Sequence, residues 1–221
     1  IGTLRILASE RKGVSSLVLG DSLNDWNPTA VYKHTKQEKF FTNLPEKEKF
    51  DLIISNPPFG VRLQNQFSSR FGQIRSAEHF LIENGLDALR INGKMILCVP
   101  QGFLFRAGTE QNLRHFLIEN DFLEMVISLP SGMLMNTGVN IAIIVISKDK
   151  EVKGKVRFVD AKNFVESSSS REKKLQDYKL NSAIKNLTDS GEIRIVANET
   201  IANNNYNFNV PLYFQKEFHG A

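Results

Sequence analysis

The sequence is poor in cysteine and has no long apolar segment. Cys98 is its single cysteine, so no disulfide can form within the chain, and a reducing cytoplasm is the expected compartment. No apolar run approaches the roughly 18 residues that a membrane span needs, and no signal peptide is visible. Cysteine and histidine do not cluster, so no metal site is predicted. The sequence therefore points away from disulfide-stapled secreted domains and from a membrane partner.

The composition is that of a folded, mildly basic protein. Its 221 residues are 41% hydrophobic, which suffices for a substantial core in one large domain or a domain with an appendage. Disordered chains combine low hydrophobicity with high net charge, and this chain does not. The formal net charge of +4 permits a nucleic-acid partner without requiring one.

Short apolar runs alternate with helical patterns along the chain. The segments 76–94 and 108–122 have helical spacing, with Ser76 and Thr109 as expected caps and Gly93 placed to end the first helix. The middle apolar runs are continuous rather than alternating, as in strands covered on both faces. An α/β fold with a parallel sheet and helices on its faces is therefore predicted. Its expected strands lie at 16–19, 51–54, 94–99, 124–129 and 140–147.

The last two runs are too close in sequence for a parallel crossover. Only about ten residues lie between 129 and 140, whereas a parallel connection needs a dozen or more, usually helical. The strand at 140–147 is therefore expected to run antiparallel to the strand at 124–129. The parallel strands should then end in Pro/Gly turns at one edge of the sheet, where open α/β sheets bind ligands. Turns rich in these residues are also ordinary connections.

The run at 51–54 ends abruptly in Asn56-Pro57-Pro58-Phe59. Exocyclic amino groups of bases and amides are poor nucleophiles, because the nitrogen lone pair is delocalised. Two acceptors aimed at the N–H bonds would localise that pair, and the Asn56 side-chain oxygen together with a backbone carbonyl can supply them. The prolines fix φ and so preorganise the acceptors, while Phe59 offers a flat face for stacking. An ordinary turn after a strand is the structural alternative.

The motif and the segments after it resemble a known family. N6-adenine DNA methyltransferases show, in the same order, segments similar to KFDLIISNPPFG, LRINGKMILCVPQGFLF, LEMVISLPSGMLMNTGVNIAIIVISK and ETIANNNYNFNVPLYF. The chain looks most like the modification subunit of type I restriction–modification systems or a related fused type II enzyme. The resemblance covers most of 15–214. It implies a Rossmann-like, S-adenosylmethionine-dependent methyltransferase sheet with a reversed hairpin strand, in the cytoplasm of a bacterium or archaeon.

The resemblance assigns catalytic roles by position. Asn56 and the Pro57 carbonyl would accept hydrogen bonds from the adenine N6 amino group, held in place by the Pro57-Pro58 pair. Phe59 would stack on the base, which must first be flipped out of duplex DNA.

A second set of residues is expected at the cofactor. In the family, an acidic side chain after the third strand approaches the adenine of S-adenosylmethionine, and the matching residues here are Asp21, Ser22 and Leu23. A turn or cap aspartate is the structural alternative for Asp21.

The segment that follows the motif carries arginines and aromatics and no acidic residue. Arg62, Arg70 and Arg75, interleaved with Phe67 and Phe71, suit phosphate contact and base stacking. We therefore expect DNA binding from this segment, with a solvated loop as the structural alternative.

Two features of the family have no counterpart in the sequence. These are the glycine-rich cofactor loop and the acidic residue that holds the cofactor ribose. The expectation is therefore that the chain begins inside the catalytic domain, lacks its first strands, and alone binds S-adenosylmethionine weakly or not at all. Residues 1–150 would form the C-terminal part of the catalytic domain. Residues 151–221 would form an extension of edge strand, linker and helix that leads toward a recognition domain or a partner.

The resemblance also implies partners. Double-stranded DNA would be the substrate, a specificity subunit or a fused target-recognition domain would read its sequence, and a restriction subunit would be a further partner. Two alternatives stay open. One is an N-P-P-F methyltransferase acting on guanine N2 of RNA or on a protein glutamine. The other is a non-catalytic subunit that only holds DNA, which the missing cofactor loop favours and the intact motif at 56–59 disfavours.

Overall fold

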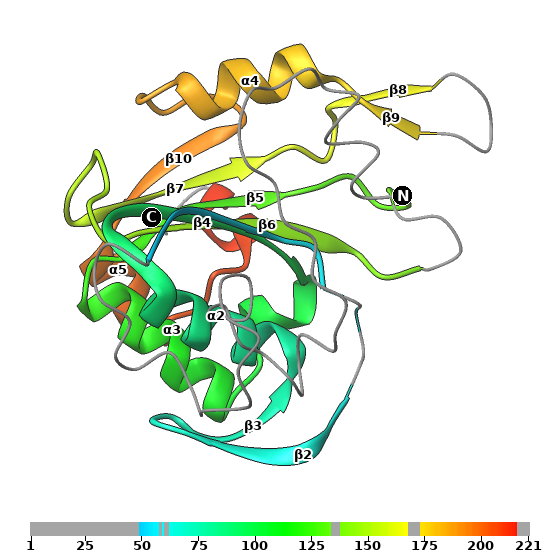
Figure 1. The fold of residues 1–221 in the computed structure, drawn as a ribbon. Helices are drawn as coiled ribbons and strands as arrows, with labels where there is room; N and C mark the ends of the chain where they lie inside the picture. The colour runs from blue at the N-terminus through cyan, green and yellow to red at the C-terminus, as the bar shows by residue number, and fades with distance from the viewer. Residues whose placement is uncertain (1–48, 58, 60–61, 134–137, 168–172, 216–221) are drawn as a thin grey trace, which may run out of the picture.

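The computed structural model of the protein describes residues 49–57, 59, 62–133, 138–167 and 173–215, and for residues 62–68, 75, 167 and 173 it describes the backbone. The expected strand at 16–19 lies outside these residues. At the centre is a six-stranded sheet in the spatial order β1–β4–β6–β5–β7–β10 (Figure 1). Its strands are β1 (Phe50–Ser55), β4 (Leu89–Pro100), β5 (Leu123–Ser128), β6 (Ile141–Ser147), β7 (Lys155–Asp160) and β10 (Ile193–Ala197).

The strand directions confirm the expected hairpin and the common edge. β1 pairs with β4 in parallel, and β6 is antiparallel to both β4 and β5. β1, β4 and β5 therefore run in one direction, and the three Pro/Gly turns that follow them lie at the same edge of the sheet, here called the carboxyl edge. The sheet is mixed rather than parallel throughout, because β7 is parallel to β5 while β10 is antiparallel to β7.

The first expected helix is shorter than its pattern suggested. Helix α2 spans Ala77–Ala88 and begins at the expected cap, since the Ser76 Oγ accepts from the His79 backbone N–H at 3.3 Å. Gly93 does not end it; β4 begins at Leu89 instead. The glycine serves close packing within the strand, because a Cβ there would lie 2.9 Å from the Phe50 carbonyl oxygen and still closer to the Leu89 side chain.

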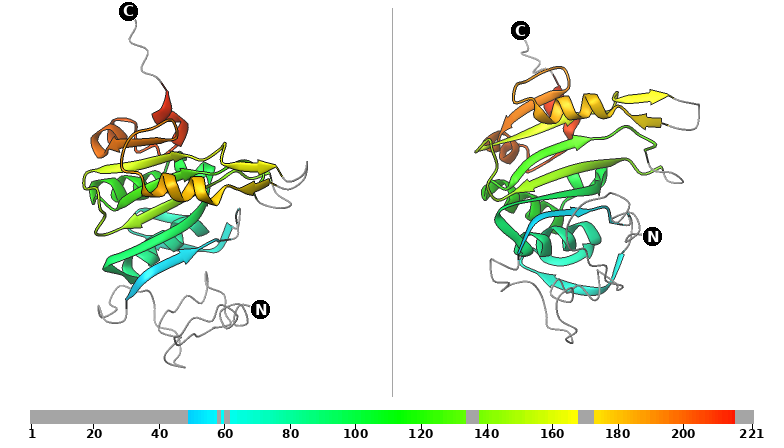
Figure 2. Two further views of the ribbon diagram at one scale, coloured as in Figure 1. Left: turned by 90° about the horizontal axis from the view of Figure 1, so that it is seen from above. Right: turned by 45° about the horizontal axis from the view of Figure 1, so that its top comes forward.

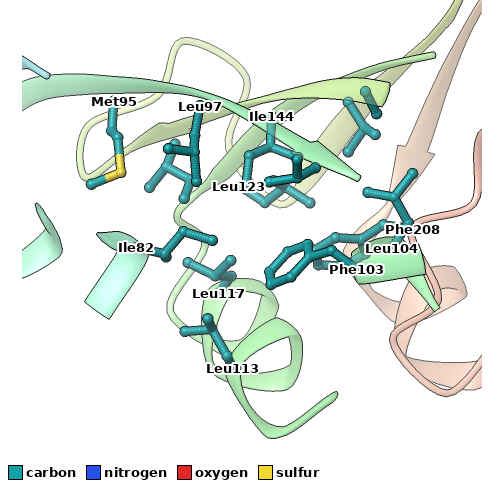
Figure 3. Close-up of a cluster of buried hydrophobic side chains, with 14 of the residues drawn as sticks. Ile82, Met95, Leu97, Phe103, Leu104, Leu113, Leu117, Leu123, Ile144 and Phe208 are labelled. Carbon is teal, nitrogen blue, oxygen red and sulfur yellow. The ribbon is translucent and has the colours of Figure 1, made fainter. Parts of the chain in front are cut away.

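The sequence predicted Thr109 as the N-cap of the second helix. In the structure, helix α3 spans Thr109–Glu119 and its N-cap position is occupied by Gly108. Gly108 has a φ of 83°, a backbone conformation that favours glycine. Together α2 and α3 bury one face of the sheet, with the 3-10 turn η3 (Gln101–Leu104) beside them (Figure 3). Side chains of the sheet that face the helices include Met95, Leu97, Leu123 and Ile144, and those facing them include Ile82, Phe103, Leu104, Leu113 and Leu117.

On the other face of the sheet, a helix covers only the half formed by β5, β7 and β10. Helix α4 (Asp177–Lys185) packs onto β5, β7 and β10 through Leu180, Ala183 and Ile184, and both views of Figure 2 place it far from β1. On this face, Leu52 and Ile54 of β1 are 53% and 70% exposed. Within the described residues β1 is therefore covered on one face and not on both as expected, because it is an edge strand of the described sheet and α4 does not reach it.

The region after residue 150 continues the same sheet and core. β7, expected as an edge strand, lies between β5 and β10, and β10 forms the edge. Helix α5 (Asn198–Asn203) and the 3-10 turn η4 (Val210–Phe214) follow, and Ile201, Phe208 and Val210 join the core against α3. Two short hairpins complete the described fold: β2 (Arg62–Ser69) with β3 (Gly72–Ser76), and β8 (Val165–Ser167) with β9 (Lys173–Leu175). In the part of the chain that the structure describes, no helix has the length and apolarity needed to cross a membrane.

Candidate functional site

The Asn-Pro-Pro-Phe motif lies at the carboxyl edge, directly after β1. Ser55 is the last residue of β1 and pairs with Leu97 of β4, so the strand fixes where the next residues begin. Asn56 is exposed and Pro57 is buried beside it. An exposed amide next to a buried, φ-restricted proline can serve as a preorganised hydrogen-bond acceptor. Pro58 lies outside the described residues.

Phe59 turns back from the edge toward the face of the sheet that carries α4. Its ring is half-buried and packs against the apolar cluster formed on β5, β6 and β7, which includes Ile127, Leu129 and Ile141. The cluster therefore fixes the ring while part of its surface stays accessible, as stacking on a planar group requires.

A pair of amides stands at the same edge, one strand away from the motif. Gln101 follows β4; its backbone N–H donates to the Asn140 carbonyl at 2.9 Å, and its Nε2 donates to Asn209 Oδ1 at 3.4 Å. The asparagine-rich segment thus returns to the edge and meets the loop after β4. The sequence indicated only that this segment leads to another domain. The contact between Gln101 and Asn209 could not be predicted, because the two residues are 108 positions apart.

A buried arginine holds these two segments together. Arg114 of α3 is 1% exposed, and its guanidinium donates to the carbonyl oxygens of Phe103 and Arg106 at 2.7 Å each and of Tyr206 at 2.8 Å. Burial lowers the pKa of Arg114 to about 10, against the opposing effect of Glu110. The side chain is therefore still a cation at neutral pH, and its three backbone partners compensate for its desolvation. No local pattern in the sequence signals this role.

The residues expected to bind DNA separate into two ends of the β2–β3 hairpin, here called the ribbon. Arg62 of β2 pairs with Ser76 of β3, and Arg75 directly precedes Ser76. The two arginines therefore lie at the end of the ribbon that joins the motif and α2. Phe67 pairs with Ile74 toward the other end. Arg70 lies in the turn between β2 and β3, where it forms ion pairs with acidic residues of α2.

The expected cofactor residues Asp21, Ser22 and Leu23 lie outside the described residues. Among the described residues, His, Cys, Asp and Glu nowhere gather in a group of three that could hold a metal ion.

Comparisons with known proteins identify similar chains in two domains of life. The chain is 30% identical over 139 residues to the type I restriction enzyme MpnII methylase subunit of Mycoplasma pneumoniae, a match that covers 57% of this chain and 25% of the relative. It is 27% identical over 219 residues to the type I restriction enzyme MjaVIII methylase subunit of Methanocaldococcus jannaschii, covering 90% and 36%.

The fold has a similar counterpart among solved structures. The type I restriction-modification system methyltransferase subunit from Streptococcus thermophilus matches with a TM-score of 0.66 and 25% identity, over 76% of this chain and 39% of that one. The chain thus spans about a quarter to two fifths of the length of these relatives. The family model described as N-6 DNA Methylase matches residues 18–219. Because this match extends over most of the sequence, the chain belongs to the N-6 DNA Methylase family.

Proposed function

We propose that this chain carries the target-base side of a site-specific DNA adenine-N6 methyltransferase of a restriction–modification system. The observation that carries the proposal is the placement of Asn56, whose exposed amide stands at the carboxyl edge on the buried support of Pro57. This edge is the ligand-binding side of open α/β sheets. Membership in the N-6 DNA Methylase family supports the reaction class.

In the proposed reaction the motif prepares the amino group of a flipped adenine. Asn56 Oδ1 and the Pro57 carbonyl accept the two N6–H bonds, which directs the nitrogen lone pair toward the methyl donor. Phe59 stacks on the base that has left the helix. No general base is required, because the amino nitrogen becomes acidic once it is alkylated and then releases its proton to water.

The family and the fold support S-adenosylmethionine as the methyl donor. When bound, it supplies an electrophilic methyl group to the exposed amino nitrogen. Asp21, Ser22 and Leu23 remain our proposed contacts for its adenosine half.

The DNA partner and the subunit partners follow from the same proposal. Arg62 and Arg75, at the motif end of the ribbon, are proposed phosphate contacts. Base-specific reading would come from a specificity subunit or a fused recognition domain, with a restriction subunit as a further partner. The two curated relatives described above come from a bacterium and an archaeon, which supports a cytoplasmic location in such a cell.

Nucleoside analysis of the reaction products tests this function. The enzyme that contains this chain, assembled with its DNA-recognition component, is incubated with methyl-labelled S-adenosylmethionine and with DNA, RNA and protein. We expect the label in N6-methyladenine of DNA. Label in RNA guanine or in protein glutamine would replace the proposed substrate, and DNA binding without any transfer would show a non-catalytic subunit.

A further inference from the structure

The ribbon is a fixed element with two distinct ends. It lies on the far side of α2 and α3 from the sheet (Figure 1). One end, with Arg62 and Ser76, joins the motif and α2. At the other end the turn between Ser69 and Gly72 rests on the helices, so the ribbon spans their outer surface.

Arg70 makes a double ion pair at the turn. Its Nε and its backbone N–H both donate to Glu83 Oε1, at 3.1 and 3.2 Å. Its Nη2 donates to both carboxylate oxygens of Asp87, at 2.9 and 3.0 Å. The same guanidinium lies over the Phe116 ring of α3, 5.6 Å from the centroid. One side chain thus contacts both helices that carry the ribbon.

Other contacts hold the same turn. Asn112 Nδ2 of α3 donates to the Phe71 carbonyl at 3.2 Å, and the Phe71 ring packs against Phe116 with centroids 5.2 Å apart. Gly72 has a φ of 116°, and a Cβ there would lie 2.8 Å from Thr109 Cγ2. The turn therefore sits close enough to α3 that a glycine is required.

The charges around Arg70 favour its carboxylate partners over a phosphate, although its side chain is 43% exposed. Burial alone would raise the pKa of Glu83, yet the nearby His79, whose Nε2 lies 3.6 Å from Oε2, and the hydrogen bonds from Arg70 lower it below its ordinary value, so this carboxylate is ionised at neutral pH. Burial also opposes the Arg70 charge, but Asp87 and Glu83 raise the pKa of the guanidinium. Moving Arg70 onto a phosphate would leave the Glu83 side chain, only 11% exposed, without its main cation.

We propose that Arg70 is a positioning residue that fastens the far end of the ribbon to α2, and that it makes no contact with DNA. Its fastening sets the path of the ribbon, and with it the place of Arg62 and Arg75 at the end of the ribbon that pairs through Arg62 and Ser76. The part of this inference that concerns DNA rests on the proposed function, whereas the fastening does not.

Hydrogen exchange of the protein without DNA tests the fastening. Arg70→Ala and Asp87→Asn should each speed the exchange of ribbon amides around Phe67 and Ile74 by about tenfold or more, because each removes charge-assisted hydrogen bonds. Arg70→Lys should give an intermediate rate, since an ammonium cannot pair bidentately with Asp87 while also holding Glu83. Unchanged ribbon exchange in both Arg70→Ala and Asp87→Asn would overturn the proposal.

The pair Lys153 and Asp149 provides matched controls. These residues form an exposed ion pair with Nζ and Oδ1 2.7 Å apart, outside the ribbon and its helices. Lys153→Ala and Asp149→Asn remove the same kinds of charge and should leave ribbon exchange unchanged.

DNA affinity at several salt concentrations, measured on the assembled methyltransferase, separates anchoring from contact. Each lost phosphate contact reduces the slope of log affinity against log salt by about 0.9. We expect Arg70→Ala and Asp87→Asn to weaken DNA binding alike, several-fold, with the slope unchanged. A smaller slope for Arg70→Ala, with normal or tighter binding by Asp87→Asn, would show a DNA contact and contradict the proposal. Unchanged affinity in both variants would also contradict it. If the unmodified assembly neither binds nor methylates DNA, the proposed function fails, while hydrogen exchange still decides the fastening.

Discussion

Arg114 holds the loop after β4 in place through buried hydrogen bonds. It supplies hydrogen bonds to three backbone carbonyls that belong to η3, the loop after it and the asparagine-rich segment. Arg114→Met should lower the free energy of unfolding by about 3 kcal/mol, because it leaves buried acceptors without donors. Urea unfolding of the chain measures this. Lys153→Met, at an exposed surface position, should change the same free energy by less than about 0.5 kcal/mol.

At the residue scale, the sequence predicts what consecutive residues encode. The motif at 56–59 could be found because its amide, prolines and ring are adjacent, and the structure places Asn56 at the predicted edge. The partners of Arg70 and Arg114 could not be found, since they depend on chain segments brought together by folding. A basic residue looks the same in the sequence whether or not it pairs with carboxylates in the fold, as Arg70 does with Glu83 and Asp87.

The two main helices allow a test at the scale of elements. Ser76 caps α2 with its side chain, whereas α3 starts at a glycine and Thr109 follows it. Ser76→Ala should therefore cost about 1 kcal/mol of unfolding free energy. Thr109→Ala should cost clearly less, because no capping hydrogen bond is lost. Chemical denaturation of both variants compares them, and an equal loss would contradict the observed caps.

A second element-scale test concerns the junction at the end of α3. The Asp121 carboxylate pairs with the buried Lys150 and accepts from the Gly154 N–H at 2.9 Å and from Asn198 Nδ2 at 2.8 Å. Burial alone would raise its pKa, but these contacts together lower it below its ordinary value of 3.8. The folded state thus binds fewer protons here than the unfolded state. The stabilisation is complete above pH 3.8 and is lost as the pH falls through the lowered value.

Asp121→Asn makes this pH dependence measurable. Asparagine tolerates the positive φ of 56° at this position, so the backbone is preserved. The variant should lose about 2 kcal/mol at pH 6, and the difference from the unmodified chain should shrink as the pH is lowered below 3.8. Denaturant titrations between pH 6 and pH 3 follow the difference. A constant difference across this range would show that the carboxylate charge does not contribute.

Connection lengths and apolar runs account for most of the predicted elements. The reversed hairpin strand followed from the short link between 129 and 140, and the pairing of β5 with β6 is antiparallel as expected. Helix ends were less predictable. Gly93 was expected as the C-cap of the first helix, but it lies within strand β4, where it packs closely against Leu89 and Phe50. β10 escaped prediction because its five residues stand alone in a polar region.

At the scale of the molecule, the half of the sheet away from α4 exposes large apolar side chains. Leu52 and Ile54 are the main ones on β1, whereas Ile53 between them points to the opposite face and packs against the core with α2. Contiguous exposed apolar surface binds hydrophobic dyes and promotes association. The double variant Leu52→Lys, Ile54→Lys should therefore bind less anilinonaphthalene sulfonate and associate less, with unfolding free energy nearly unchanged.

Ile53→Lys is the matched control for that face. It places a charge against the core and should destabilise the chain by several kcal/mol. Dye fluorescence and sedimentation of the three proteins compare them. Equal dye binding by the double variant and the unmodified chain would show that the apolar face is covered in solution.

Asn56, as the acceptor that prepares the adenine amino group, is the central residue of the proposed function. The decisive measurement is single-turnover methyl transfer to DNA by the assembled enzyme with Asn56→Ala, together with its affinity for S-adenosylmethionine. We predict a loss of transfer of about a hundredfold or more, with cofactor affinity largely intact. Formation of N6-methyladenine at the unmodified rate would contradict the role of Asn56 and the proposal built on it.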